Sequence, residues 1–383
     1  MKVHSTLTAY LAALSFTSAL PQTTKHGPQP LSLKMAQSIM SRNQGVLANM
    51  SDVSALLQAG FTQKAFDAAI LQYPESKSLI NAYIAKSIDS VVPVVSNATR
   101  DVSLPLDRLS NGNELLRIYT ESEKASYHQA LGALRKSVDL QPRNAQHGLW
   151  YYVYPYWSYL DGMYSFAPFM TAYAKTRDTP ASAIDDVVLQ MDLLWQHCYD
   201  NKTGLLVHGY DASHKAVWVT STVTGASPHV WGRSLGWYCM ALIDTFELLP
   251  ATAHTARAYM AGRFRELMDA VGRAADGETG AWWQVMDQPG RKGNYIESSA
   301  GSMFVYSMLK GLRLGVLSPQ ATFTSTGSSG VSQRGFRDTA TRAYEYIAKT
   351  FVVDNGTALG WNGTVGVCSL NSTATYEVSA FIP

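Results

Sequence analysis

Charged residues are scarce in this 383-residue chain, where they make up 16% of the sequence against about 25% in a typical soluble protein. Lys plus Arg (31) exceeds Asp plus Glu (29) by two, so the formal net charge is +2. A nucleic-acid-binding protein would instead show a strongly basic balance and a basic patch. The composition therefore predicts no nucleic-acid partner.

Several familiar catalytic motifs are missing as well. The chain has no GxSxG serine elbow, no HExxH zinc motif, no Walker loop and no dinucleotide-binding GxGxxG. No cluster of potential ligands has metal-site spacing, so we expect neither a metal nor a cofactor. Beyond the N-terminus, no stretch approaches the roughly 20 apolar residues that a membrane-spanning helix needs. The sequence thus predicts no integral membrane segment.

Cysteine is also rare, with Cys198, Cys239 and Cys368 as its three occurrences. Cys198 and Cys239 follow apolar helical stripes, so we interpret both as core residues. An odd number of cysteines leaves one unpaired even in an oxidising compartment, and a single disulfide is the alternative.

The N-terminus has the anatomy of a secretory signal over residues 1–19. Lys2 precedes an uncharged apolar stretch from Leu7 to Phe16, and small residues lead to Ala19, where we expect cleavage. A buried N-terminal helix is the alternative.

Six Asn-x-Ser/Thr sequons follow, at Asn49, Asn97, Asn201, Asn355, Asn362 and Asn371. Six glycosylation acceptors after a signal favour a secreted, extracellular glycoprotein.

Helical periodicity dominates the rest of the chain. Apolar residues recur at three- and four-residue steps and predict about eleven helices, including segments near 31–47, 62–72, 106–119 and 166–176. Brief strand candidates are Leu205–His208 and Val217–Thr220, and the Ser- and Thr-rich residues 318–333 are expected to form a surface loop. Without an internal sequence repeat, a regular solenoid is disfavoured. We therefore expect residues 20–383 to form one all-α domain of antiparallel helices closed into a toroid.

An aromatic segment, HGLWYYVYPYWSYLDGMYS, runs from His147 to Ser165 and carries a lone acid, Asp161. Flat aromatic faces flanked by hydroxyls suit sugar rings, although an aromatic packing layer is the alternative. We expect Pro168 in the first turn of the next helix, with Asp161 just before it. Desolvation among aromatic rings would raise the pKa of Asp161 and make it a proton donor; an N-capping role is equally compatible with its position.

Three further polar residues, Asp107, Arg233 and His208, are candidates for catalysis or substrate binding. Asp107 opens another helix, where it either caps the helix or acts beside Asp161. In SPHVWGRSLGW, Arg233 lies among Trp231 and Trp237 and could bind a substrate carboxylate through two parallel hydrogen bonds. A structural cation–π contact is the alternative for this arginine. His208 ends a short apolar run and is either a structural group or a catalytic residue.

Four stretches together resemble glycoside hydrolase family 105, the unsaturated rhamnogalacturonyl hydrolases, and more distantly the unsaturated glucuronyl hydrolases of family 88. They are LDRLSNGNELLRIY, YPYWSYLDGMYSFAPFMTAYA, SPHVWGRSLGWYCMALIDTFELLP and GAWWQVMDQPGRKGNYIESSAGSMFVYSMLKGLRLG. The resemblance implies an (α/α)6 barrel with Asp161 as general acid/base and Asp107 as the second active-site aspartate. It also implies a substrate pocket lined by His208, Trp231, Arg233 and Trp237.

The resemblance further implies a substrate and a reaction. The expected substrate is an unsaturated oligosaccharide from pectin, whose 4,5-unsaturated uronic acid is released from the non-reducing end by hydration of its double bond. Alternatives are an unsaturated glucuronyl hydrolase acting on other lyase products and an inactive sugar-binding homologue. The chain departs from the family in ending before the last helix, so we expect a barrel that lacks it, and in the bulk of Tyr156 and Trp157 beside the catalytic loop.

Overall fold

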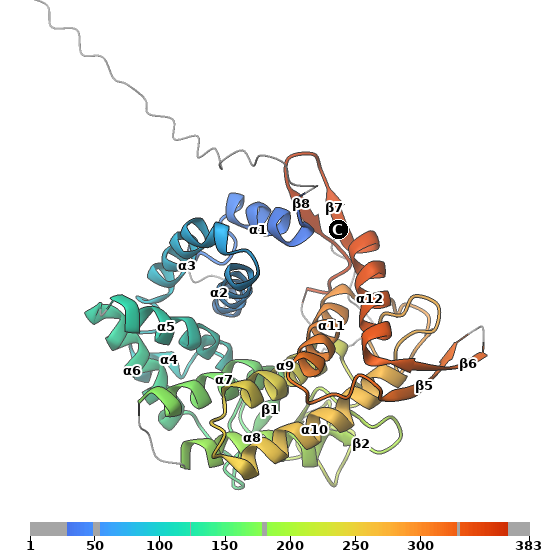
Figure 1. Cartoon of the computed structure of the whole chain (residues 1–383). Helices are drawn as coiled ribbons and strands as arrows, with labels where there is room; N and C mark the ends of the chain where they lie inside the picture. The colour runs from blue at the N-terminus through green and yellow to red at the C-terminus, as the bar shows by residue number, and fades with distance from the viewer. Residues whose placement is uncertain (1–28, 49–53, 123, 178–181, 328–329, 367–383) are drawn as a thin grey trace, which may run out of the picture.

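Helices dominate the computed structural model, which describes residues 29–48, 54–122, 124–177, 182–327 and 330–366 (Figure 1). Eleven of the described helices have 11 to 20 residues, the number that the periodicity predicts. Their bounds are α1 Leu31–Ser41, α2 Ala55–Gln72, α3 Lys77–Val91, α5 Gly112–Ser122, α6 Ala125–Leu140, α7 Asp161–Thr176, α8 Ser182–Cys198, α9 Gly232–Leu248, α10 His254–Arg273, α11 Ser298–Arg313 and α12 Phe336–Phe351. Shorter helical turns are η1 Pro74–Ser76, α4 Ala98–Asp101 and η2 Leu106–Asn111.

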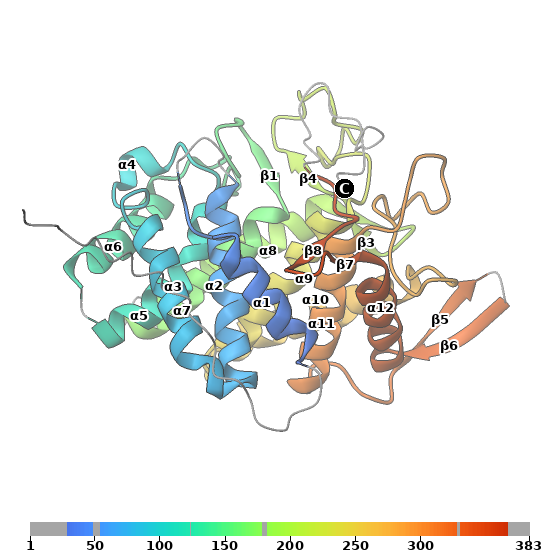
Figure 2. The ribbon, with the colours of Figure 1, turned by 90° about the horizontal axis from the view of Figure 1, so that it is seen from above.

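Strands are short and pair only within antiparallel hairpins or loop contacts in the described part of the chain. The pairs are β1 with β4, β2 with β3, β5 with β6 and β7 with β8. Their bounds are β1 Trp157–Tyr159, β2 Tyr199–Asp200, β3 Leu205–Leu206, β4 Gly209–Asp211, β5 Thr322–Gly327, β6 Gly330–Gly335, β7 Val352–Asp354 and β8 Leu359–Trp361. Figure 2 shows β1 and β4 together along one rim of the helical body, which is where the candidate site lies.

The helices form a ring of two layers (Figure 1). Helices α2, α5, α7, α9 and α11 face the interior, and α3, α6, α8, α10 and α12 lie outside them. The sequence of α9 explains its inner place, since its residues from Ser234 to Ile243 are apolar, aromatic or small and all of them are buried. A helix that is apolar on every side is stable only where other helices surround it. The alternation of layers is that of the predicted all-α barrel.

Two glycines allow the inner helices to approach closely. At Gly236 of α9, an added Cβ would lie 2.7 Å from the sulfur of Met303 on α11. At Gly112, where η2 passes into α5, it would lie 2.1 Å from the ring of Phe169 on α7. Either position would force the neighbouring helix away if it carried a side chain.

The end of the described chain returns to its beginning. The backbone N–H of Leu359 in β8 donates to Ser38 Oγ of α1 over 2.8 Å, and Arg42 donates to the Leu359 carbonyl over 2.9 Å. The β7–β8 hairpin therefore lies between α12 and α1 and connects the last helix of the ring to the first (Figure 1).

Three local predictions are wrong. Helix α7 begins at Asp161 and contains Pro168 in its interior, because packing of its buried face outweighs the local cost of proline. Residues 318–333 contribute to the β5–β6 hairpin, which the ring of Phe323 anchors by packing against Gly272 of α10. Residues 217–220 are turn and coil instead of a strand.

Other predictions fall differently. Cys198 and Cys239 are buried free thiols, as expected of core residues. Asn97, Asn201 and Asn355 are exposed and Asn362 is partly buried, whereas the signal segment, Asn49, Cys368 and Asn371 lie outside the described residues. None of the described helices combines the length and apolar character needed to cross a bilayer.

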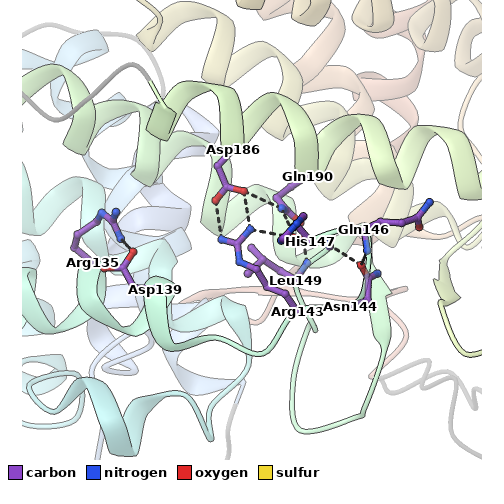
Figure 3. A network of polar contacts seen from close by, with 10 residues as sticks. Arg135, Asp139, Arg143, Asn144, Gln146, His147, Leu149, Asp186 and Gln190 are labelled. Atoms are coloured by element: carbon purple, nitrogen blue, oxygen red, sulfur yellow. Dashed lines mark hydrogen bonds and ion pairs between the residues drawn. The ribbon is translucent and has the colours of Figure 1, made fainter.

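A polar network fixes the turn that leads into the aromatic segment (Figure 3). The guanidinium of Arg143 donates to both carboxylate oxygens of Asp186 on α8, over 2.7 and 2.8 Å, and to the carbonyl of His147 over 3.1 Å. Gln190 completes the network: its side chain donates to Asp186 and accepts from the Leu149 N–H. Burial raises the pKa of Asp186, but the hydrogen bonds and charge of Arg143 outweigh that effect and lower it.

This network yields a stability prediction. Asp186→Asn removes a charge-assisted pair and should lower the free energy of unfolding at pH 7 by about 1.5–3 kcal/mol, measured by urea denaturation. Because the folded-state pKa of Asp186 is lowered, its contribution is present near neutral pH and is lost as pH falls through that pKa. The matched control is Asp139→Asn, which breaks the exposed Arg135 pair in the same figure and should cost less than about 0.5 kcal/mol. Equal costs in the two variants would contradict the bracing role.

Candidate active site

The pairing of β1 with β4 brings Asp161 and His208 together. Leu160, between β1 and α7, donates its N–H to the carbonyl of His208 over 3.1 Å, and His208 directly precedes β4. Asp161 is the next residue and the first of α7. As a result, His208 Nε2 lies 3.2 Å from Asp161 Oδ2, although the two residues are far apart in the sequence.

Helix α9 supplies a second partner for the same carboxylate. Ser234 Oγ donates to Asp161 Oδ2 and lies 3.3 Å from the His208 carbonyl oxygen. Ser234 is fully buried, so this contact lies on the inner face of the first turn of α9. Ser234 could not be predicted as a site residue, since a serine within an apolar helix gives no signal of its own.

These contacts determine the protonation of Asp161. Burial acts to raise its pKa, as expected from the sequence, but the charge and hydrogen bond of His208 and the hydroxyl of Ser234 outweigh burial. The net result is a pKa below the ordinary value. The expectation that Asp161 is protonated in the free protein is therefore wrong, because the fold adds hydrogen-bond donors from His208 and Ser234 to the aromatic surroundings.

Asp107 has the opposite electrostatics. It lies in η2, buried, and accepts a hydrogen bond of 2.8 Å from the hydroxyl of Tyr151 at Oδ2, while Oδ1 has no hydrogen-bond partner among the described residues. Burial raises the pKa of Asp107 to about 7, with a smaller contribution from the charge of Asp161. The structure thus pairs an ionised carboxylate with a carboxyl that stays protonated up to about neutral pH.

Trp231 lies beside His208, the partner of Asp161. Its ring centroid is 4.9 Å from that of His208, and Tyr159 is also 4.9 Å from His208. Tyr151 stacks on Tyr159 at 4.9 Å, so aromatic rings surround the histidine. The aromatic segment was identified from the sequence as a whole, but only the fold shows that Tyr151 and Tyr159 are its members next to the carboxylates.

Arg233 stacks on Trp231, with its guanidinium carbon 4.6 Å from the ring centroid. Its two terminal nitrogens donate to the carbonyls of Val365 and Gly366 over 2.6 and 2.8 Å. The buried carboxylate of Glu297 accepts from the Val365 N–H over 3.3 Å. Arg233 therefore makes its two hydrogen bonds to backbone carbonyls and not to the substrate carboxylate that we predicted as its partner. The alternative prediction, a cation–π contact with Trp231, is confirmed.

Trp237 is not brought to this group of residues. One turn along α9 from Arg233, it packs in the ring interior against Tyr164 of α7 at 4.5 Å and Phe61 of α2 at 5.5 Å. It belongs to a different buried cluster from the one that holds Trp231. The structure therefore unites Asp161, His208 and Trp231, with Asp107 coupled to them through Tyr151 and its charge.

The raised pKa of Asp107 yields a prediction. An acid whose folded-state pKa is raised stabilises the fold least at high pH, because only the unfolded chain ionises freely between its ordinary value of 3.8 and about 7. Asp107→Asn removes this penalty, which linkage puts at roughly 4 kcal/mol at pH 8. The variant should gain stability over the wild type at pH 8 and little at pH 4, in urea titrations. A gain that is the same at both pH values would contradict a protonated Asp107.

Comparison with known proteins identifies the family. The family model described as Glycosyl Hydrolase Family 88 matches residues 33–380. The structure is similar to a family 105 glycoside hydrolase of C. acetobutylicum ATCC 824, with 31% identity, a TM-score of 0.74 and coverage of 90% of each chain. It shares its fold with an unsaturated glucuronyl hydrolase of Bacillus sp. GL1, at 12% identity, a TM-score of 0.58 and 88% of each chain.

A curated relative, Protein Atu3128 of Agrobacterium fabrum, is 38% identical over 150 residues, which are 39% of this chain and 62% of that protein. The all-α (α/α)6 fold class and the family resemblance predicted from the sequence are confirmed. The chain belongs to glycosyl hydrolase family 88, with family 105 among its relatives.

Proposed function

We propose that this protein is a glycoside hydrolase that removes the 4,5-unsaturated uronic acid from the non-reducing end of pectin (rhamnogalacturonan) oligosaccharides produced by lyases. The observation that carries the proposal is Asp161, a largely buried carboxylate, 12% exposed, which His208 and Ser234 hold among aromatic rings. Family membership supports uronyl hydrolase chemistry, and the rhamnogalacturonan substrate is our inference from the quoted motifs.

The reaction is the hydration of an enol ether. Asp161 transfers a proton to C4 of the sugar, and the positive charge that develops at C5 is stabilised by the ring oxygen. The same carboxylate then takes a proton from a water molecule, whose oxygen bonds to C5. The product is a hemiketal that opens and releases the neighbouring sugar, and Asp161 ends protonated, as it was in the substrate complex before the proton transfer. The spacing rule for displacement at the anomeric carbon does not apply to this route.

Substrate binding raises the pKa of Asp161, so that the carboxylate takes up from solvent the proton that it lacks in the free protein. A bound uronate adds a negative charge beside Asp161 and competes for His208, the main partner that lowers the pKa of the aspartate. Both effects favour protonation of Asp161. Asp107 is neutral below about pH 7, so it can donate a hydrogen bond to a sugar hydroxyl or carboxylate. We infer that His208 and Trp231 contact the uronate. Arg233 positions the backbone of Val365 and Gly366 beside Trp231.

We also propose that the protein is secreted and glycosylated. The apolar N-terminal segment and the six sequons support this proposal, and the exposed side chains of Asn97, Asn201 and Asn355 are accessible acceptors. Mass spectrometry of the protein secreted by a eukaryotic host would test it through the expected cleavage after Ala19.

The activity is tested with lyase-generated rhamnogalacturonan oligosaccharides. Turnover should remove the ultraviolet absorbance of the enol ether, with products identified by mass. Asp161→Asn should lower kcat at least about a thousandfold, since it removes the group that transfers protons, while the circular dichroism of the helices stays unchanged. The control Asp139→Asn should retain wild-type activity. Near-normal turnover by the Asp161 variant would refute the catalytic assignment, and a preference for glucuronyl lyase products would redirect the substrate assignment.

A further inference from the structure

A group of aromatic side chains extends outward from the candidate site and is not used by the reaction. We call Tyr154, Trp157 and Trp218 the outer aromatic cluster. The ring centroids of Tyr154 and Trp157 are 5.0 Å apart, and Trp157 meets Trp218 edge-on at 5.1 Å. Tyr154 and Trp157 come from the aromatic segment, while Trp218 comes from the loop after β4.

The outer aromatic cluster is continuous with the catalytic residues. Tyr154 lies 6.4 Å from Tyr159, and Tyr159 lies 4.9 Å from His208, which contacts Asp161. Trp218 belongs to the same buried cluster as Tyr159 and Trp231. A path of aromatic rings therefore leads from His208, beside the reacting carboxylate, to the partly exposed Tyr154 and Trp157.

The outer aromatic cluster has the exposure and polarity of a binding surface. Tyr154 and Trp157 are partly exposed, and Val217, beside Trp218, is 74% exposed. Trp218 itself is only 7% exposed, and its indole N–H has no hydrogen-bond partner among the described residues. A buried N–H donor without an acceptor is uncommon in a folded protein, and a ligand hydroxyl would satisfy it.

The backbone next to the cluster is strained. Tyr156 has a φ of 69°, in the left-handed region that a tyrosine rarely adopts, and its carbonyl accepts a hydrogen bond of 3.0 Å from Ala212. Tyr156 is 44% exposed and directly precedes Trp157 in the sequence. Strained residues of this kind are concentrated at binding and catalytic sites.

We propose that Tyr154, Trp157 and Trp218 form a second sugar-binding site, which holds the third and later units of the oligosaccharide, counted from the unsaturated uronic acid. Aromatic faces would stack on the apolar faces of these sugars, and a sugar hydroxyl would accept from the Trp218 N–H. The inference rests on the proposed function and adds a preference for substrates longer than a disaccharide. If the cluster is only a packing layer, chain length has no effect on turnover.

The test compares kcat/KM for unsaturated di- and tetrasaccharides from rhamnogalacturonan. The wild type should prefer the tetrasaccharide, and Trp157→Leu should lower its kcat/KM roughly tenfold through KM, which corresponds to one stacking contact of about 1.4 kcal/mol. The disaccharide value should change less than about twofold. Trp218→Phe, which keeps a ring and removes the N–H, should give a smaller loss of the same kind. Tyr344→Leu, an exposed tyrosine on α12, is the matched control.

Two results would overturn the site. They are equal kcat/KM values for both lengths in the wild type, and a loss in Trp157→Leu that is the same for both lengths. The site is tested independently of the proposed function by calorimetry, which measures the binding of saturated rhamnogalacturonan tetrasaccharides that have no double bond to hydrate. If no unsaturated substrate is turned over, the function falls; weaker tetrasaccharide binding by Trp157→Leu than by Tyr344→Leu would still support the site, and equal binding would overturn it.

Discussion

The candidate site depends on one short stretch of antiparallel backbone pairing. β1 and β4 exchange only a few hydrogen bonds, and the bond from Leu160 to the His208 carbonyl extends that pairing to the residue before Asp161. Since Asp161 starts α7 immediately afterwards, the direction of the helix and the position of the carboxylate are set together. The network around Arg143 and Asp186 supports the turn at the start of the aromatic segment, and α9 closes the arrangement by offering Ser234 from the opposite side.

Two carboxyl groups of similar sequence context acquire opposite properties from their surroundings. Asp161 has hydrogen-bond donors, and its pKa is lowered in spite of burial. Asp107 has a single neutral donor in Tyr151, and burial dominates. An acid kept neutral beside an ionised carboxylate avoids the repulsion of two adjacent negative charges. Burial of Asp107 lowers the free energy of unfolding at high pH. A loss of stability at a functional residue is common in enzymes.

Elsewhere in the ring, buried charge serves the fold. Asp244 of α9 accepts from Lys310 of α11 over 2.6 Å and also pairs with Lys64 of α2, so three inner helices meet at one carboxylate. The two lysines hold the pKa of Asp244 below its ordinary value although burial acts to raise it. A buried charge of this kind is tolerated because oppositely charged partners surround it on more than one helix. The cluster lies in the last turns of α9, whereas Ser234 lies in its first turn.

The sequence by itself predicted the number of long helices and most of their positions, because helix periodicity acts locally. It also identified Asp161, Asp107, His208 and Trp231 as candidates: Asp161 is a lone acid among aromatic residues, and the resemblance of the quoted motifs to the family added the other three. The position of Trp237 in the ring interior, the use of Arg233 to hold Val365 and Gly366, and the ionised state of Asp161 were decided by tertiary structure. Each of these depends on partners that are distant in sequence: a pKa or a hydrogen bond is set by the groups that the fold brings within a few ångströms, and periodicity does not contain that information.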